Sequence, residues 1–269
     1  MFKILDKIQL AEQTKLFVIN APEIAIKAKP GQFVVVRISE TGERIPLTIA
    51  DMDPKKGTLE LVVQEIGYTT KKMGELKEGE AILDLVGPLG MPTHIEKLGT
   101  IVGVGGGIGI AALYPVIRGF KNSGNKVISV IGARSKNLLV WEDKMKNVSD
   151  ELYVTTDDGS YGQKGLVTNP IKELIEKGIK IDLVFAVGPT IMMKAVADTT
   201  KPYNIKTIVS LNPIMIDATG MCGVCRVNVG GKTKFTCVDG PDFNAHEVDF
   251  ELLMQRQKMY KNKEREMVI

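Results

Sequence analysis

The chain has 269 residues, of which 44% are hydrophobic and 25% charged, so it can bury a core large enough for two domains. Its net charge is only +3 and its basic residues are spread along the chain, which argues against nucleic-acid binding. The first ten residues are too charged for a signal peptide, and the charge-free run 100–117 is too rich in glycine for a membrane span. We therefore expect a cytoplasmic protein whose clustered thiols bind metal.

Residues 1–98 carry short apolar, β-branched runs, which is typical of a small antiparallel barrel or sandwich. Turn signals such as Pro30-Gly31, Lys56-Gly57 and Gly87-Pro88 separate these runs. The sequence therefore predicts a β domain over 1–98, with strands at 15–20, 32–38, 47–50, 58–64 and 81–86.

From residue 99 onward, strand-like and helix-like segments alternate, which predicts a doubly wound parallel sheet over 99–211. A cysteine- and glycine-rich module follows at 212–249, and a C-terminal helix is expected within 250–269, with helical character from 248 to 266. The expected α/β strands are 100–104, 126–132, 151–155, 181–187 and 206–210, and the expected helices are 110–121, 137–146, 167–177 and 191–197.

The first strand of the predicted α/β domain ends in a glycine run, 103–109, that opens a helix. Glycines at such a turn let the backbone approach a pyrophosphate, whose charge the helix N-terminus favours. The run does not fit the strict GxGxxG spacing, so a tight strand–helix turn without a ligand is the alternative. Gly188-Pro189 ends a later strand, and the carboxyl ends of parallel strands converge on one ligand crevice.

The end of the second α/β strand bears on the choice of nucleotide. It reads Gly132-Ala133-Arg134-Ser135, without the acidic residue that commonly binds a ribose 2′-hydroxyl. Arg134 could bind a 2′-phosphate, or it could be a solvated loop charge. These residues leave NAD and NADP both open.

All three cysteines lie in one stretch, at a spacing typical of metal ligands and not of a disulfide framework. Two residues separate Cys222 from Cys225, and eleven separate Cys225 from Cys237. His246 as the fourth ligand would complete a zinc site. Asp217 would instead give Asp-x4-Cys-x2-Cys-x11-Cys, the plant-type ferredoxin spacing with aspartate first. Small, uncharged residues between the ligands suit an iron–sulfur loop, but the pattern leaves both sites open.

Four motifs in chain order resemble the ferredoxin–NADP reductases and, more closely, the iron–sulfur flavoprotein subunits of the dihydroorotate dehydrogenase type. They are PGQF at 30–33, RIPLTI at 44–49, GYTT at 67–70 and GPLG at 87–90, and the resemblance covers essentially the whole chain. The dihydroorotate branch has four cysteine ligands, whereas aspartate at the first position is similar to the branch of electron-bifurcating, NADH-dependent reduced ferredoxin:NADP oxidoreductases. The resemblance thus implies a 2Fe–2S cluster held by Asp217, Cys222, Cys225 and Cys237.

The same resemblance implies FAD in the barrel. Thr48 would lie near the flavin N5, with the neighbouring residues beside the ring, although plain strand alternation also explains this pattern. The wider family has Arg-x-Tyr-Ser, whereas here Arg44 precedes Thr48 by four residues and Leu47 replaces the tyrosine, which leaves Arg44 open as a phosphate ligand. The residues implied at the FAD site are Arg44, Pro46, Leu47, Thr48, Ile49, Gly67, Thr69 and Thr70.

In the α/β domain the resemblance implies NAD(H) as cosubstrate, with the pyrophosphate at the glycine turn and the nicotinamide beside Gly188-Pro189. Arg134 would then contact the adenine or ribose. Residues 156–160 (TDDGS) resemble a loop at the nucleotide site, although two adjacent carboxylates also suit an Asx turn. The implied contacts are Gly105, Gly106, Gly107, Gly109, Arg134, Asp157, Gly159, Gly188 and Pro189.

The implied function is hydride exchange between NAD(H) and FAD, for which no general acid or base is needed. Single electrons would then pass through the cluster to a larger flavin and iron–sulfur subunit of a heterodimer, with ferredoxin reached through that partner. The stretch 250–268 could dock the partner or pack on its own chain. Two other functions are open: electron transfer for a dihydroorotate or other dehydrogenase, and a zinc-stapled nucleotide-binding regulatory subunit without redox activity.

Overall fold

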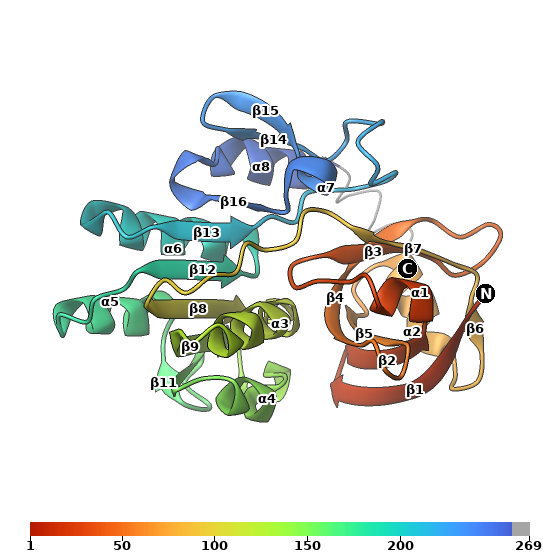
Figure 1. Ribbon diagram of the computed structural model, residues 1–269, viewed down its shortest axis with the longest axis horizontal. Coiled ribbons are helices and arrows are strands. Elements are labelled where there is room, and N and C mark those ends of the chain that lie inside the picture. Colours follow the sequence, from red (N-terminus) through yellow and green to blue (C-terminus); the bar gives the residue numbers. More distant parts are fainter. Residues whose placement is uncertain (260–269) are drawn as a thin grey trace.

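The computed structural model describes residues 1–259, which form three parts in chain order (Figure 1). An antiparallel barrel comes first and an α/β domain follows. A small module with a two-stranded sheet then lies at one edge of the α/β domain. Within the described residues, no helix is both long enough and apolar enough to cross a membrane.

The barrel is a nearly closed, seven-stranded antiparallel sheet in the order β6-β1-β2-β5-β4-β3-β7. The five predicted strand regions are confirmed, except that 81–86 splits into two short strands. Strand β1 and the helices α1 and α2 had no predicted counterpart. The elements are β1 (Phe2–Ala11), β2 (Thr14–Asn20), α1 (Pro22–Ala25), β3 (Phe33–Arg37), β4 (Ile45–Asp53), β5 (Thr58–Gln64), α2 (Tyr68–Glu75), β6 (Ala81–Ile82) and β7 (Asp84–Leu89).

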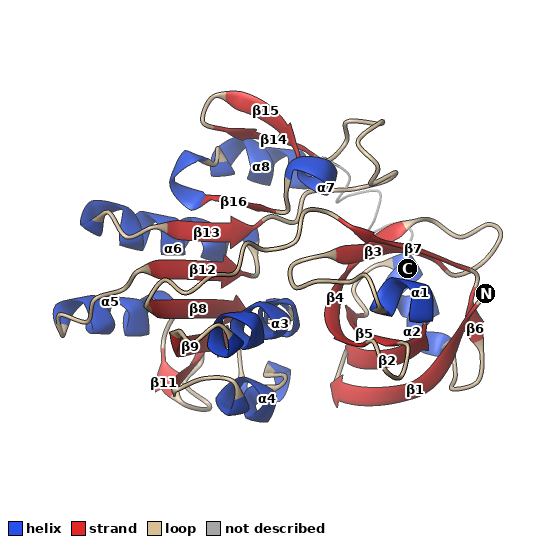
Figure 2. Ribbon diagram, viewed as in Figure 1, coloured by secondary structure: helices blue, strands red, loops and turns tan. Residues whose placement is uncertain are grey.

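The α/β domain is confirmed as a doubly wound sheet whose parallel strands lie in the order β11-β10-β9-β8-β12-β13, with the antiparallel edge strand β16 (Asp242–Asn244) next to β13 (Figure 2). Its elements are β8 (Thr100–Gly106), α3 (Gly109–Asn122), β9 (Lys126–Ala133), α4 (Glu142–Asn147), β10 (Glu151–Thr156), β11 (Gln163–Lys164), α5 (Thr168–Glu176), β12 (Leu183–Val187), α6 (Thr190–Thr200) and β13 (Thr207–Ser210).

The C-terminal module is not separate from this sheet. It contains β14 (Arg226–Val229), β15 (Lys232–Phe235), α7 (Thr236–Asp239), β16 (Asp242–Asn244) and α8 (Phe250–Gln257). Strand β16 pairs antiparallel with β13 and becomes the edge strand of the α/β sheet. The module is therefore fixed to the α/β domain by backbone hydrogen bonds as well as by its side chains.

Alternate residues of the central strands pack on opposite faces of the α/β sheet. Val102 and Val104 share an apolar core with α5 and α6, whereas Ile101 shares one with α3 and α4. Gly103 lies on the α3 face, and a Cβ there would overlap the Ile117 side chain. This glycine is therefore needed for close helix–sheet packing, which is one reason the glycine run begins before the turn.

Two helix predictions need correction. The segment 137–146 is not one helix: a 3-10 turn, Lys136–Leu138, is followed by extended backbone and then by α4. Trp141 interrupts it at φ 58°, and its ring packs edge-on against Tyr114, with the Lys144 Nζ 3.8 Å from the ring centroid. At the C-terminus, α8 ends at Gln257, and the remainder of the predicted helix from residue 260 lies outside the described residues.

Helix α3 attaches the α/β domain to the barrel. The Arg118 guanidinium makes two hydrogen bonds to the Asp51 carboxylate on β4, at 3.0 and 2.5 Å. Burial tends to lower the pKa of Arg118, but the contacts with Asp51 outweigh it and raise the pKa. Ala111 of α3 also shares a small buried apolar cluster with Ala50 of β4. These contacts, one near the start of α3 and one in its second half, hold the helix against the second half of β4.

Asp242 lies where all three parts of the molecule meet. It belongs to the cysteine module, pairs with Ser210 across β13–β16, and accepts a hydrogen bond of 2.6 Å from Thr93 of the segment that leaves the barrel. Its Oδ1 is buried without a hydrogen-bond partner among the described residues. Burial raises the pKa of Asp242 to about 6, against the opposing effect of Thr93 and Ser210.

This pKa predicts how stability depends on pH. Below about pH 4 the Asp242 carboxyl is neutral in both the folded and the unfolded chain, and above pH 6 the folded chain must bury a carboxylate. The group therefore lowers the free energy of unfolding as pH rises between these values, by up to about 3 kcal/mol. We expect Asp242→Asn to stabilise the protein at pH 8 and to leave stability at pH 4 nearly unchanged, as measured by denaturant unfolding. Equal effects at both pH values, or the same gain for the exposed Asp239→Asn, would contradict this.

Candidate functional site

The outer face of β4 carries the first group of predicted site residues. Thr48 is exposed and points out of the barrel, whereas Ile49 is fully buried in the barrel core and Leu47 packs partly against that core. A ligand on this face would thus meet the Thr48 side chain but only the backbone of Ile49. Arg44, just before β4, is exposed, and no hydrogen bond or ion pair between described residues involves its side chain.

Helix α2 presents its N-terminus on the same domain. The Thr70 hydroxyl and Gly67 exchange two hydrogen bonds of 3.0 Å, which fix the start of the helix. Thr69 is buried, and its hydroxyl donates to the Glu43 carboxylate at 3.0 Å. First-turn N–H groups have no acceptor within a helix, and the helix dipole favours an anion there. The residues therefore fit the pyrophosphate of FAD, although Thr69 must exchange Glu43 for a phosphate oxygen.

The glycines of the run 103–109 have two different roles: some allow close packing, and one borders open space where a ligand could bind. A Cβ on Gly105 would lie 3.1 Å from the Ile110 Cα, and one on Gly109 would lie 2.5 Å from the Val187 carbonyl oxygen. Gly107 differs, because its φ is 55° and a Cβ there would have no neighbour within 4 Å. The first two glycines let the chain pack against itself, whereas Gly107 leaves open space at the N-terminus of α3.

Four strand ends meet at this edge of the sheet, as predicted from their positions. A Cβ on Gly188 would lie 3.1 Å from the Gly106 nitrogen. The turn after β12 is therefore in direct contact with the glycine turn after β8. The Gly107 N–H donates to the Gly132 carbonyl at 2.8 Å, and the Asp157 N–H donates to the Ala133 carbonyl at 3.1 Å. The crevice predicted at the carboxyl ends of the strands is therefore assembled by backbone contacts.

The side chains that follow the second and third strands line a surface cavity of about 470 Å³, formed by Ser135, Lys136, Asn137, Asp158 and Ser160. Arg134 and Asp157 are exposed beside it. Asp158 accepts a hydrogen bond from the Ser160 N–H at 2.9 Å, which is the Asx turn considered as the alternative. Hydrogen bonds to Ser160 lower the pKa of Asp158, so this carboxylate is charged at neutral pH.

Two of the three cysteines converge inside the module. The Sγ atoms of Cys225 and Cys237 lie 3.2 Å apart and both residues are buried, while Cys222 is exposed nearer the surface. Burial and the neighbouring Cys225 raise the pKa of Cys237 to about 12, whereas hydrogen bonds from the Val224 N–H and its neighbours lower the pKa of Cys222. Two soft donors this close can serve one iron, which would deprotonate them on binding.

Asp217 lies at the start of the cysteine loop and is half-buried. Its carboxylate accepts hydrogen bonds from the Thr219 hydroxyl at 2.8 Å and from the Met221 N–H at 3.3 Å, and these bonds lower its pKa. Positive φ angles at Ala218, Gly220 and Gly223 turn the loop back on itself. Asp217 thus supplies a charged carboxylate on a loop whose Thr219 and Met221 N–H groups point toward it. Such an anionic group can serve as a ligand of an iron–sulfur cluster.

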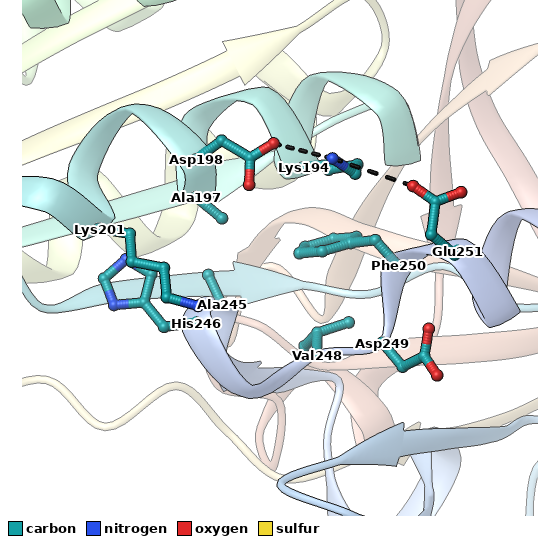
Figure 3. Close-up of a pocket in the computed structure, with 10 residues that line it drawn as sticks. All are labelled: Lys194, Ala197, Asp198, Lys201, Ala245, His246, Val248, Asp249, Phe250 and Glu251. Carbon is teal, nitrogen blue, oxygen red and sulfur yellow. Dashed lines mark hydrogen bonds and ion pairs between the residues drawn. The ribbon is translucent and has the colours of Figure 1, made fainter.

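His246 takes no part in this group. It lies beside α6, half-buried, with its Nε2 3.0 Å from the Thr200 hydroxyl, in a small cavity shared with Lys201 and Phe250 (Figure 3). Within residues 1–259, no three His, Cys, Asp or Glu side chains surround one metal-sized point.

A buried apolar cluster joins the cysteine pair to the barrel, and sequence analysis did not anticipate it. Phe33 and Val35 of β3 share it with Met215, Cys225 and Cys237. Phe33 is also the β3 partner of Thr48 on β4. The candidate flavin face and the cysteine pair therefore lie one strand apart. The PGQF motif was the only available signal, and it marked a turn without indicating what Phe33 contacts.

Comparisons with known proteins agree with this arrangement. The FAD-binding domain of oxidoreductases matches residues 1–94, and the iron–sulfur cluster binding domain of dihydroorotate dehydrogenase B matches residues 212–249. These matches favour an iron–sulfur cluster over zinc in the module.

Relatives cover almost the whole chain. An electron transfer subunit homolog of dihydroorotate dehydrogenase B (NAD(+)) from Thermotoga maritima is 48% identical over 98% of this chain and 93% of its own. A probable electron transfer subunit from Methanocaldococcus jannaschii is 34% identical over 92% of this chain and 90% of its own. A solved chain from the NADH-dependent reduced ferredoxin–NADP oxidoreductase is 47% identical, with a TM-score of 0.95 over 100% of this chain and 96% of that one.

The fourth ligand can be tested by substitution. We expect Asp217→Cys to retain iron and acid-labile sulfide but to change the visible spectrum and the reduction potential, because a thiolate donates more electron density than a carboxylate. His246→Ala should leave iron content, spectrum and potential unchanged. An Asp217→Cys protein with the parental spectrum and potential, or a His246→Ala protein without iron, would contradict this ligand set.

Proposed function

The chain belongs to the family of dihydroorotate dehydrogenase B electron transfer subunits, and we propose that it exchanges hydride between NAD(H) and FAD and passes single electrons through a 2Fe–2S cluster to a larger partner subunit. As a member of this family it is an oxidoreductase subunit that binds FAD and an iron–sulfur cluster. We further propose that the partner is a flavin and iron–sulfur subunit that reaches ferredoxin, in an electron-bifurcating NADH/ferredoxin:NADP transhydrogenation.

The observation that carries the bifurcating assignment is the match to the NADH-dependent reduced ferredoxin–NADP oxidoreductase chain, whose structure was described for flavin-based electron bifurcation. It extends over the whole chain at 47% identity, so it includes all three parts and their mutual arrangement. Asp217 at the first ligand position supports the same branch.

Each part of the chain has a distinct task in this proposal. The start of α2 binds the FAD pyrophosphate through first-turn N–H groups, and Thr48 contacts the flavin edge. The turn at Gly107 binds the NAD(H) pyrophosphate, while Gly188-Pro189 lies against that turn and positions the nicotinamide. Bound FAD supplies the conversion between two-electron and one-electron transfer, which amino-acid side chains cannot supply.

Helix α3 orients the two nucleotides toward each other. Because Arg118 and Ala111 hold it against β4, the glycine turn lies beside the strand that carries Thr48. Neither histidine is needed in this arrangement: His246 bonds to Thr200, and His94 is exposed beside Glu96. The chain therefore acts by positioning its cofactors.

A second candidate is electron transfer for a dihydroorotate dehydrogenase, favoured by the description of the Thermotoga maritima relative. The two candidates share every cofactor of this chain and differ in the partner. Affinity purification of the chain from its source, followed by activity assays on the complex, would separate them.

We expect NADH, added without oxygen to the FAD- and cluster-loaded chain, to bleach the flavin and cluster absorption, and NADPH to do so much more slowly. The purified complex should couple NADH, ferredoxin and NADP and should not oxidise dihydroorotate. A complex that reduces the chain with dihydroorotate would support the second candidate. A colourless preparation after reconstitution with iron, sulfide and FAD would contradict both.

The glycine turn provides a matched pair of substitutions. Gly107 and Gly178 both have positive φ, at 55° and 71°, and a Cβ on either has no neighbour within 4 Å. Alanine at either position should therefore cost a similar 1–2 kcal/mol of folding stability, roughly the penalty of the left-handed conformation. Only Gly107→Ala should also weaken NADH binding, because its methyl group enters the space assigned to the pyrophosphate. Equal NADH affinities in the two variants, measured by titration, would exclude this turn as the binding site.

A further inference from the structure

The described part of the chain leaves two buried side-chain oxygens without a hydrogen-bond partner, and both lie close to Cys237 in the sequence. They are the Thr236 Oγ1 and the Asp242 Oδ1. Native proteins satisfy nearly all buried polar atoms, and the exceptions often have a redox or catalytic role. The segment 236–242 thus contains both Cys237, a proposed cluster ligand, and Asp242, whose carboxyl group has a hydrogen-bond partner on only one of its two oxygens.

The surroundings of Asp242 contain hydroxyl groups and no compensating cation. Thr93 donates to Oδ2 at 2.6 Å, and Ser210 is the strand partner on β13. The titratable groups on the adjoining segments face elsewhere: His94 lies 3.4 Å from the Glu96 carboxylate, and Asp239 accepts the Phe235 N–H at 2.6 Å. None of the ion pairs between described residues includes Asp242. Its charged form is therefore stabilised by hydroxyls alone.

Such a group can gain or lose a proton near neutral pH. Burial without a cation raises its pKa to about 6, so both forms of Asp242 are accessible in the folded chain. An added negative charge nearby raises the pKa of a buried carboxyl further, because the low dielectric of the interior weakly screens the repulsion. Cys237 lies within the short helix α7, and only Gly240 and Pro241 separate that helix from Asp242 at the start of β16, so an electron on a cluster bound at Cys237 is a negative charge on the adjoining segment.

We propose that Asp242 is a redox-linked proton site: it binds one proton from solvent when the iron–sulfur centre of its module gains an electron, and it releases that proton when the electron leaves. The proposal rests on the proposed function, which assigns the cluster to this module and NADH, through FAD, as the reductant. The balance is one electron and one proton taken up together, so the net charge of the module is unchanged. No bond other than the carboxyl O–H forms or breaks.

Linkage fixes the sign of the effect. If reduction favours protonation of Asp242, then protonation of Asp242 favours reduction by the same amount. The reduction potential is therefore highest at low pH, where the group is neutral in both redox states, and falls as pH rises through its titration. It becomes constant again at high pH, where the carboxylate is charged in both states. Thr93 favours the charged form, so its removal moves this window to higher pH.

The experiment is a redox titration of the cluster in the full chain loaded with FAD and cluster, followed by visible and electron paramagnetic resonance spectra at pH 5.5 to 9. The wild-type potential should fall with rising pH, and Asp242→Asn should make it independent of pH. Thr93→Val should keep the fall but shift it to higher pH. Asp239→Asn removes an exposed acid from the same module and should retain the wild-type pH dependence.

Two results would overturn the proposal: a wild-type potential that does not change with pH, or an Asp242→Asn protein with the wild-type pH dependence. If Asp242→Asn does not fold, Thr93→Val becomes the deciding variant. A reduction potential that falls over the same pH range in Thr93→Val as in the wild type would then contradict the proposal. These outcomes are distinct from failure of the proposed function. A chain that assembles no iron–sulfur cluster, by iron and sulfide content, contradicts the function, whereas an assembled cluster with a pH-independent potential contradicts only this inference.

Discussion

The pairing of β3 with β4 brings the outer face of the barrel at Thr48 close to the buried cysteine pair. Thr48 faces outward from β4, and its partner Phe33 on β3 belongs to the apolar cluster that also buries Cys225 and Cys237. Neighbouring strands lie about 4.8 Å apart, so the outer face at Thr48 and the buried cysteine pair are separated by roughly one strand and one side chain.

The glycine run illustrates how one sequence feature serves several physical needs. Gly103 and Gly105 let α3 approach β8, and Gly109 lets the turn approach Val187, so these three would be required even without a ligand. Within the run 103–109, only Gly107 has both a positive φ and open space around it. Because most of these glycines are needed for packing, the run 103–109 departs from the GxGxxG spacing of dinucleotide-binding turns. It still leads into a helix at the crevice where the strands end.

Local patterns predicted the strands and the order of the parts because those features depend on neighbouring residues. Strand 58–64 was predicted with its observed bounds, whereas β1 was missed because charges interrupt its apolar alternation. The helix expected at 137–146 is interrupted at Trp141, which has a left-handed backbone and packs against Tyr114, a tertiary contact that helix propensity cannot indicate. Contacts between distant segments, such as Thr93 with Asp242, had no sequence signal at all.

The two aspartates of the cysteine module differ because of their surroundings and not their chemistry. Asp217 accepts hydrogen bonds from its own loop, which lower its pKa and keep it available as an anionic ligand. Asp242 is half-buried as a residue, but its Oδ1 is fully buried without a partner among the described residues, and this burial raises its pKa and disfavours the same anion. The first environment keeps a carboxylate charged, as a ligand requires, whereas the second lets a carboxyl group change its protonation state, as the proposed redox-linked proton site requires. Their separation by the three cysteines along the chain allows each environment to be set independently.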